Sequence, residues 1–160
     1  MIWGCFIGDK LGPIVFIDGT VNQDTYIGIL TQHFLPFLDA LRSNDNTTPL
    51  YFVQDNATSH RAIKTRKWFE TVTEKYNLVV MDWPPNSPDL NIIEQLWTHL
   101  KRELYRRFPD TSSLTGSLTA IKSKIRQRLH MIWWDIGASI LDTLIKSMQS
   151  RVAAVVRARG

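Results

Sequence analysis

The stretch from Leu50 to Tyr105 most constrains the fold of this chain. It contains two short apolar runs, at 50–54 and 78–81, and residues 63–76 between them repeat apolar side chains at helical spacing. A strand, a helix and a second strand in that order predict a β-α-β unit in an α/β fold. Because the first run is almost continuously apolar, we expect a strand covered on both faces.

Two acids follow these runs. Asp55 ends the first, and Glu94 stands 39 positions later, just inside the helix that follows the second. A carboxylate at the C-terminal edge of a strand lies where open α/β sheets place ligands. Carboxylate oxygens suit Mg²⁺ or Mn²⁺, and the sequence offers no Cys and His cluster for zinc. We therefore expect the Asp55 and Glu94 carboxyl groups within about 10 Å of each other, with Asp89 pointing elsewhere.

Each of these positions also has a purely structural interpretation. Asp55 has the position of an Asx turn before the next helix. Asn91 and Glu94 have the three-residue spacing of a capping box. His60 fits either a general base or a capping or packing residue beside a helix start. The spacing by itself leaves these alternatives open.

The rest of the chain alternates β-forming and helical patterns. Two short runs with a glycine-rich connection, at 2–7 and 14–18, predict a β-hairpin. Residues 26–41 predict an amphipathic helix with a kink near Pro36, which lacks a backbone N–H. After the Glu94 helix, further helices are expected at 114–132, 139–148 and 151–157.

Composition limits the class of protein. At 160 residues and 44% hydrophobic, the chain has the size of one domain with its own core, and Cys5 as the only cysteine excludes an internal disulfide. No apolar segment approaches the ~20 residues of a membrane span, and the first residues do not form a signal peptide. We therefore expect a protein that is neither secreted nor membrane-spanning.

Charge is distributed unevenly along the chain. Residues 1–94 contain 7 Lys and Arg against 11 Asp and Glu, whereas residues 95–160 contain 12 against 4. The second part is therefore the one suited to bind phosphates, although helical surfaces are often rich in basic residues. The candidate nucleic-acid-binding positions lie within two helical turns: Lys101, Arg102, Arg106 and Arg107.

Two motifs carry a resemblance to a known family. QDNATSH at 54–60 and WPPNSPDLNIIEQLW at 83–97 resemble the signature of mariner-type (Tc/mariner superfamily) transposases, which belong to the DDE superfamily and have a ribonuclease H-like fold. MIWGCF at the start and SMQSRVAAVVRARG at the end resemble the same family. Ile92 departs from it, because the family commonly has Pro there. Besides the two acids, the motif positions are Asn56, His60, Trp83, Pro84, Ser87, Pro88 and Asn91.

The resemblance assigns a role to each acid. Asp55 matches the second catalytic Asp and Glu94 the third acid, whereas Asp89 matches a loop position. The family's first catalytic Asp lies on a strand ahead of MIWGCF, so the resemblance implies that residues 1–160 are a single DDE endonuclease domain lacking its first strand. The implied fold is a mixed sheet made of a β-hairpin followed by a β-α-β unit with flanking helices. The N-terminal helix-turn-helix region of such transposases is not expected within these residues.

The resemblance also implies an activity and its requirements. The expected function is metal-dependent DNA cleavage and strand transfer in cut-and-paste transposition and DNA integration, with two Mg²⁺ or Mn²⁺ ions and no small-molecule cofactor. The expected partners are DNA and a second copy or a longer transposase chain, in the nucleus of a eukaryote or otherwise in the cytoplasm. We expect residues 1–160 to be a fragment or decayed copy that is inactive alone.

Two alternatives compete with this interpretation. The first is a domesticated or degenerate nucleic-acid-binding module that retains the basic helices without catalysis. The second is a two-carboxylate hydrolase acting on sugars, which fits the acids but neither the charge distribution nor the motifs.

Overall fold

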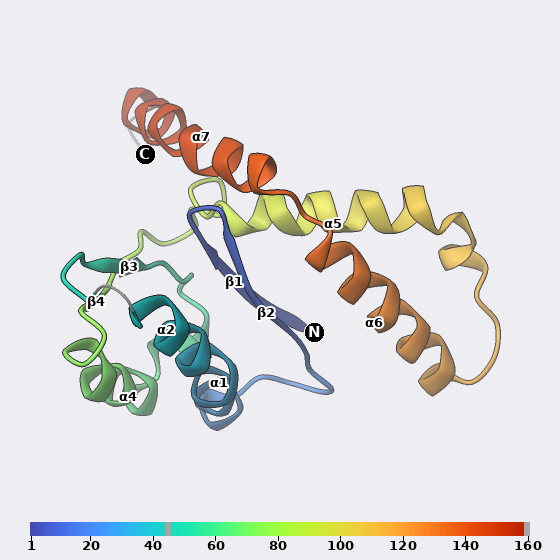
Figure 1. Cartoon of the computed structure of the whole chain (residues 1–160), viewed down its shortest axis with the longest axis horizontal. Coiled ribbons are helices and arrows are strands. Elements are labelled where there is room, and N and C mark those ends of the chain that lie inside the picture. Colours follow the sequence, from blue (N-terminus) through green and yellow to red (C-terminus); the bar gives the residue numbers. More distant parts are fainter. Residues whose placement is uncertain (44–45, 159–160) are drawn as a thin grey trace. The chain divides into compact units, whose positions relative to one another are not determined.

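The computed structural model describes residues 1–43 and 46–158 and confirms a mixed α/β chain with small sheets and many helices (Figure 1). It contains two compact units. The first unit comprises Met1–Cys5 and Val15–Asn91, and the second comprises Phe6–Ile14 and the residues from Ile92 onward. That residues 1–160 form a single domain stays a prediction.

The chain begins with the expected β-hairpin. Strands β1 (Ile2–Ile7) and β2 (Lys10–Phe16) form a two-stranded sheet. Only Gly8 and Asp9 lie between them, and Gly8 has a φ of +54°, which glycine adopts without steric cost. The second strand therefore begins at Lys10 rather than at Ile14 as expected, because so short a turn leaves the next residues free to pair.

Helical structure in the first unit starts with three consecutive segments. They are α1 (Gln23–Ile29), the π-helix η1 (Leu30–Phe34) and α2 (Leu35–Arg42). The Leu35 N–H donates to the Leu30 carbonyl, five residues back, which is π-helical spacing. Pro36 has no N–H to continue the α-helical pattern, so the irregularity falls next to the proline, as the sequence indicates.

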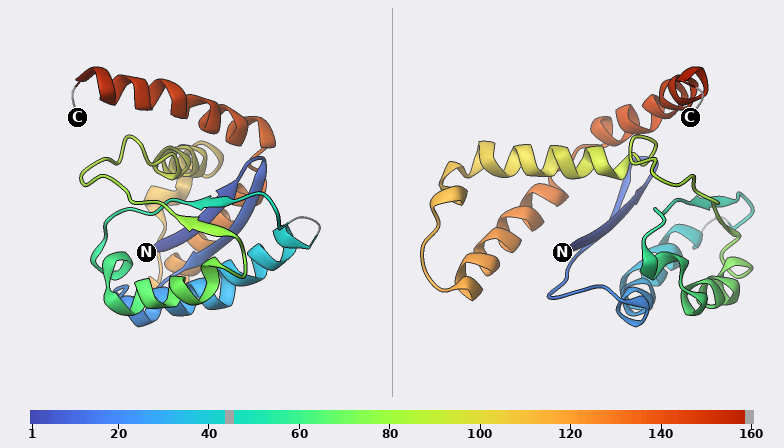
Figure 2. Two further views of the ribbon diagram at one scale, coloured as in Figure 1. Left: turned by 90° about the vertical axis from the view of Figure 1, so that its left-hand side faces the viewer. Right: turned by 180° about the vertical axis from the view of Figure 1, so that it is seen from behind.

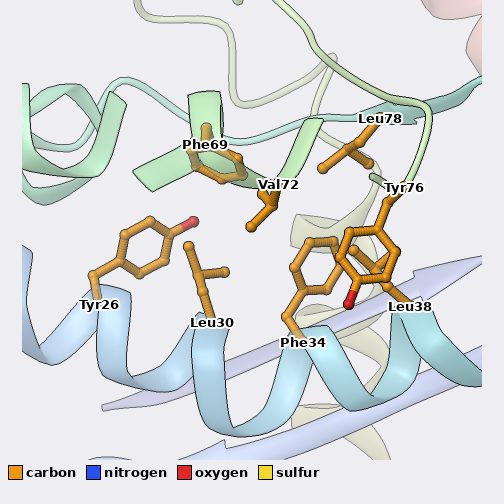
Figure 3. Packing of buried hydrophobic residues seen from close by; sticks show 8 residues of the cluster. All are labelled: Tyr26, Leu30, Phe34, Leu38, Phe69, Val72, Tyr76 and Leu78. Carbon is orange, nitrogen blue, oxygen red and sulfur yellow. The ribbon is translucent and has the colours of Figure 1, made fainter. Parts of the chain in front are cut away.

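The core of the first unit lies between these helices and α4 (Ile63–Thr73), which follows the short helix α3 (Thr58–Arg61). Side chains spaced four residues apart along α1, η1 and α2 point toward α4 and the residues after it (Figure 3). Each buried side chain of this size contributes about 1.5–3 kcal/mol of burial free energy. The cluster consists of Tyr26, Leu30, Phe34, Leu38, Phe69, Val72, Tyr76 and Leu78.

Strands β3 (Leu50–Phe52) and β4 (Leu78–Val80) lie side by side and pair in parallel (Figure 2). With α3 and α4 between them, they form the β-α-β unit that the spacing predicts. The expectation that the first strand is covered on both faces is wrong, because Tyr51 is 64% exposed and its partner Val79 is 41% exposed. Side chains of a strand alternate between faces, so only one face of this pair is packed on the core.

The second unit is mainly helical. It contains α5 (Ile93–Arg107), the 3₁₀ turn η2 (Pro109–Ser113), α6 (Leu118–Trp134) and α7 (Ala138–Ala158). In the described part of the chain, no helix is both long and apolar enough to cross a membrane.

Two of the expected helix boundaries in this unit are wrong. The helix expected from residue 114 starts at Leu118, because Gly116 has a φ of +122° and the Ser117 side chain accepts a hydrogen bond from the Ala120 N–H. The helices expected at 139–148 and 151–157 are one continuous helix, α7. Residues 138–158 contain no glycine or proline that would end it.

A network of ion pairs joins α5 to the end of α6. The Glu103 side chain is buried and accepts hydrogen bonds from Arg106, at 2.7 Å, and Arg107, at 3.1 Å. Arg107 also lies 2.6 Å from the Asp135 carboxylate. Because a buried carboxylate is stable only when it is paired and hydrogen-bonded, these arginines maintain the structure of the unit.

The ion pairs of Glu103 predict how stability depends on pH. The hydrogen bond from Arg106, supported by Arg107, lowers the pKa of Glu103 from 4.5 to about 2. A carboxylate whose pKa is lower in the folded state stabilises the fold fully at pH values above its pKa in the unfolded state. This contribution is lost as pH falls from about 4.5 toward 2. We expect Glu103→Gln to unfold at a lower temperature at pH 7 and to lose less stability over that pH window. Circular dichroism melting curves at several pH values check this, and equal pH slopes for the two chains would contradict it.

Candidate active site around Asp55

The Asp55 carboxylate is held in place by contacts to one of its two oxygens, Oδ1. It lies three residues beyond β3, with its side chain 57% exposed. Oδ1 accepts a hydrogen bond from the Ala57 N–H at 2.9 Å and lies 2.7 Å from His60 Nδ1. The Asx-turn interpretation is therefore confirmed. Within the described residues these contacts all use Oδ1, so Oδ2 is available to a ligand.

His60 lies on α3 and is mostly buried, with 18% of its side chain exposed. Its ring packs on the ring of Tyr26, with centroids 4.2 Å apart, and the Tyr26 hydroxyl donates to Gln54 Oε1 at 2.7 Å. The packing interpretation of His60 is confirmed. A general-base role stays a prediction.

The second residue of the motif connects Asp55 to the proline-rich loop. Asn56 Nδ2 donates to the Trp83 carbonyl at 2.8 Å, so it joins the end of β3 to the segment that follows β4. The indole Nε1 of Trp83 is buried and has no hydrogen-bond partner among the described atoms. Asn56 and Trp83 thus hold the two motifs of the sequence together within the first unit.

The proline-rich loop contains no regular helix or strand, as its sequence predicts. Pro84 and Pro88 are exposed, and the Ser87 hydroxyl donates to the Pro85 carbonyl at 3.1 Å. The Asn91 N–H donates to the Pro88 carbonyl at 3.1 Å, which closes a turn just before α5.

Glu94 lies in the first turn of α5 and is exposed. The capping-box interpretation is wrong: Ile92, not Asn91, is the N-cap residue, and no side chain caps this helix end. Asn91 is buried and lies one residue before the N-cap position. Ile92 has a φ of −62°, close to the value that proline would impose, so the departure from the family pattern leaves this backbone angle unchanged.

Both acids present exposed carboxylates, whose hard oxygen donors fit Mg²⁺ or Mn²⁺. Asp55 belongs to the first unit and Glu94 to the second, so their expected convergence stays a prediction. Among the residues that the structure describes, no group of three or more His, Cys, Asp or Glu side chains is placed to hold a metal ion.

The four basic candidates on α5 are all exposed but fall into two pairs. Arg106 and Arg107 make the ion pairs with Glu103 described above. Within the described residues neither Lys101 nor Arg102 is paired with a carboxylate, and Arg102 lies 3.0 Å from His99 Nδ1. Burial, and next the positive charge of Arg102, lowers the pKa of His99. Because a guanidinium group can only donate, Nδ1 is the acceptor of this hydrogen bond.

A family model described as "DDE superfamily endonuclease" matches residues 15–115. The chain belongs to this family. The match contains both motifs and both candidate acids, Asp55 and Glu94, and it confirms the resemblance that the motifs indicate.

Transposases of nematodes are similar to this DDE superfamily chain over its whole length. The Tcb2 transposase of Caenorhabditis briggsae is 31% identical over 160 residues, which are 100% of this chain and 52% of that protein. The Tc1 transposase of Caenorhabditis elegans is 32% identical over 161 residues, again 100% of this chain and 52% of that protein. The Tc3 transposase of the same species is 32% identical over 163 residues, which are 100% of this chain and 44% of that protein. The chain thus spans about half the length of these relatives.

Sequence reasoning missed the residues that support Asp55 in this DDE superfamily chain. Tyr26 has the pattern of an ordinary core residue, and its contact with His60 has no sequence signal. Gln54 lies inside the QDNATSH motif, and its position directly before the acid is the one signal that pointed to it. The pairing of Arg106 and Arg107 with Glu103 could be anticipated from their spacing of three and four residues.

Proposed function

We propose that this chain is the catalytic region of a cut-and-paste DNA transposase, in which Asp55 and Glu94 are two of the metal-binding carboxylates. The geometry of Asp55 is the observation that supports this most strongly. Its carboxylate is exposed beyond the end of a parallel strand, is oriented through Oδ1, and leaves Oδ2 available. Open α/β sheets place their ligands at this position.

The metal ions of the proposed function would be Mg²⁺ or Mn²⁺, held by Asp55 and Glu94. When bound, such ions activate a water or a DNA 3′-hydroxyl and stabilise the leaving oxygen. The contribution of the protein is to orient the carboxylates. The Ala57 N–H does this for Asp55, and the first turn of α5 presents Glu94.

The proposal includes a ribonuclease H-like sheet in which a further strand, carrying the first acid, precedes β1. It also includes DNA as the substrate, action in the nucleus if the source is eukaryotic, and assembly with a second copy or a longer transposase chain. Membership of the DDE superfamily and the similarity to transposases support these features.

DNA nicking tests the proposed function. Because the proposed first acid lies on a strand ahead of β1, we expect purified 1–160 to show no Mg²⁺- or Mn²⁺-dependent nicking of supercoiled plasmid. A longer chain that adds an Asp-bearing strand ahead of Met1 should gain nicking activity and melt at a higher temperature, since one strand would complete both the sheet and the metal site. Nicking by 1–160 itself, lost on Asp55→Asn, would show that another residue completes the site.

The basic residues of α5, which are Lys101, Arg102, Arg106 and Arg107, should bind DNA without sequence preference. If Lys101 and Arg102 supply the phosphate contacts, the log–log slope of affinity against salt should be about −1.8, a loss of about 12-fold between 50 and 200 mM salt. With all four basic residues the slope would be about −3.6. Fluorescence anisotropy with a labelled duplex measures it. Lys101→Ala with Arg102→Ala should flatten the slope to near zero, and a salt-independent affinity in the unaltered chain would contradict the prediction.

A second candidate function is a DNA-binding module without catalysis. The observation that favours it is the exposed pair Lys101 and Arg102, which is not paired with a carboxylate among the described residues. Salt-dependent binding by the longer chain, with no nicking in either metal, would support this candidate over the transposase.

A further inference from the structure

We propose that His60 is a positioning residue for Asp55, which fixes Oδ1 of the carboxylate so that Oδ2 faces a divalent cation. This inference rests on the proposed function, because it assumes that Asp55 binds a metal. It assigns a role to the last residue of the QDNATSH motif that the motif by itself does not define.

The contacts of His60 Nδ1 determine which ring nitrogen carries the hydrogen. Nδ1 lies 2.7 Å from Asp55 Oδ1 and 3.2 Å from the Asp55 backbone carbonyl. Both atoms are hydrogen-bond acceptors, so Nδ1 must be the donor. One imidazole nitrogen therefore holds the side chain and the main chain of Asp55 together.

Tyr26 holds the His60 ring in place. Tyr26 is 1% exposed within the hydrophobic core, its ring packs on His60, and its hydroxyl donates to Gln54 directly before Asp55. Burial, and next the negative charge of Asp55, raises the pKa of Tyr26 well above its usual range, so the hydroxyl stays a donor. The core of the first unit thus orients the imidazole that orients the carboxylate.

This arrangement is the kind of support that metal ligands receive in proteins. A carboxylate that binds a metal is usually fixed by a hydrogen bond from outside the coordination sphere, and removal of that partner costs about 10–100-fold in metal affinity. The Ala57 N–H also bonds to Oδ1, so the carboxylate keeps one partner when His60 is replaced. We therefore expect a loss of about 10-fold, at the lower end of that range.

Mn²⁺ binding to the longer chain that carries the upstream Asp-bearing strand tests the inference without any need for activity. Mn²⁺ broadens the backbone NMR signals of nearby residues, so a titration followed at Asn56 and Ala57 reports an apparent Kd at Asp55. His60→Asn keeps a donor at the position of Nδ1, whereas His60→Gln moves the donor to the position of Nε2. We expect His60→Asn to bind within about 3-fold of the unaltered chain, and His60→Gln and His60→Ala to bind about 10-fold more weakly. Circular dichroism melting establishes that all variants are folded.

The possible outcomes separate this inference from the proposed function. Equal affinity in His60→Gln and the unaltered chain, or an equal loss in His60→Asn and His60→Gln, would overturn the positioning role and leave the metal role of Asp55 standing. Asp55→Asn should abolish the effect of Mn²⁺ on these signals. If the unaltered chain shows no broadening that depends on Asp55, the metal role itself fails and the positioning role fails with it.

Discussion

Replacing Asp55 by Asn is expected to lower metal-dependent DNA nicking by more than about 100-fold, beyond the usual cost of losing a partner outside the coordination sphere. The reference is the longer chain that carries the upstream Asp-bearing strand. The change keeps the shape of the side chain and removes its negative charge, so a hard cation loses an anionic ligand. In transition-state terms, 100-fold corresponds to about 2.7 kcal/mol.

Glu94→Gln should have an effect of the same size, because it also replaces an anionic oxygen donor with a neutral one. Asp89→Asn is the matched control, since this acid occupies a loop position and should keep most of the activity. Initial rates of plasmid nicking in Mg²⁺ and in Mn²⁺ measure all three changes. If Asp89→Asn were as damaging as Asp55→Asn, the assignment of the acids from the motifs would be wrong.

The largest effect on stability is expected at Trp133 in the second unit. Trp133 is 0% exposed, packs against Trp97 with ring centroids 5.4 Å apart, and donates from Nε1 to the Gly12 carbonyl at 2.9 Å. Trp133→Ala removes a large buried side chain and leaves a cavity, at a cost of about 3–5 kcal/mol. For a chain of this size, that lowers the melting temperature by about 6–20 °C.

Two further variants show where this stability comes from. Trp133→Phe keeps an aromatic ring but leaves the Gly12 carbonyl without its donor, so it should cost about 1–3 kcal/mol. Trp134→Ala changes the neighbouring tryptophan, which is 52% exposed, and should stay within about 0.5 kcal/mol. Circular dichroism melting measures each change. Equal losses for Trp133→Ala and Trp134→Ala would contradict the burial argument.

Local backbone structure was predictable where a single residue type, such as proline, determines it. Pro36 indicates the irregular turn between α1 and α2 because it lacks an N–H, and the loop around Pro84 and Pro88 excludes a helix or strand. Local patterns failed where a boundary depends on one residue. Gly116 and Ser117 delay the start of α6, and the capping-box spacing of Asn91 is misleading because Ile92 takes the cap position.

The sequence by itself determined which residues can carry the chemistry: a short-range motif places Asp55 after a strand and Glu94 at the start of a helix. It also determined the family, since the same motifs lie inside the matched region. Only the tertiary structure decided how Asp55 is held, because Tyr26 and His60 are far apart in sequence and meet through packing. It also decided that Tyr51 and Val79 share an exposed sheet face, since exposure depends on what covers a strand and not on the strand's own residues.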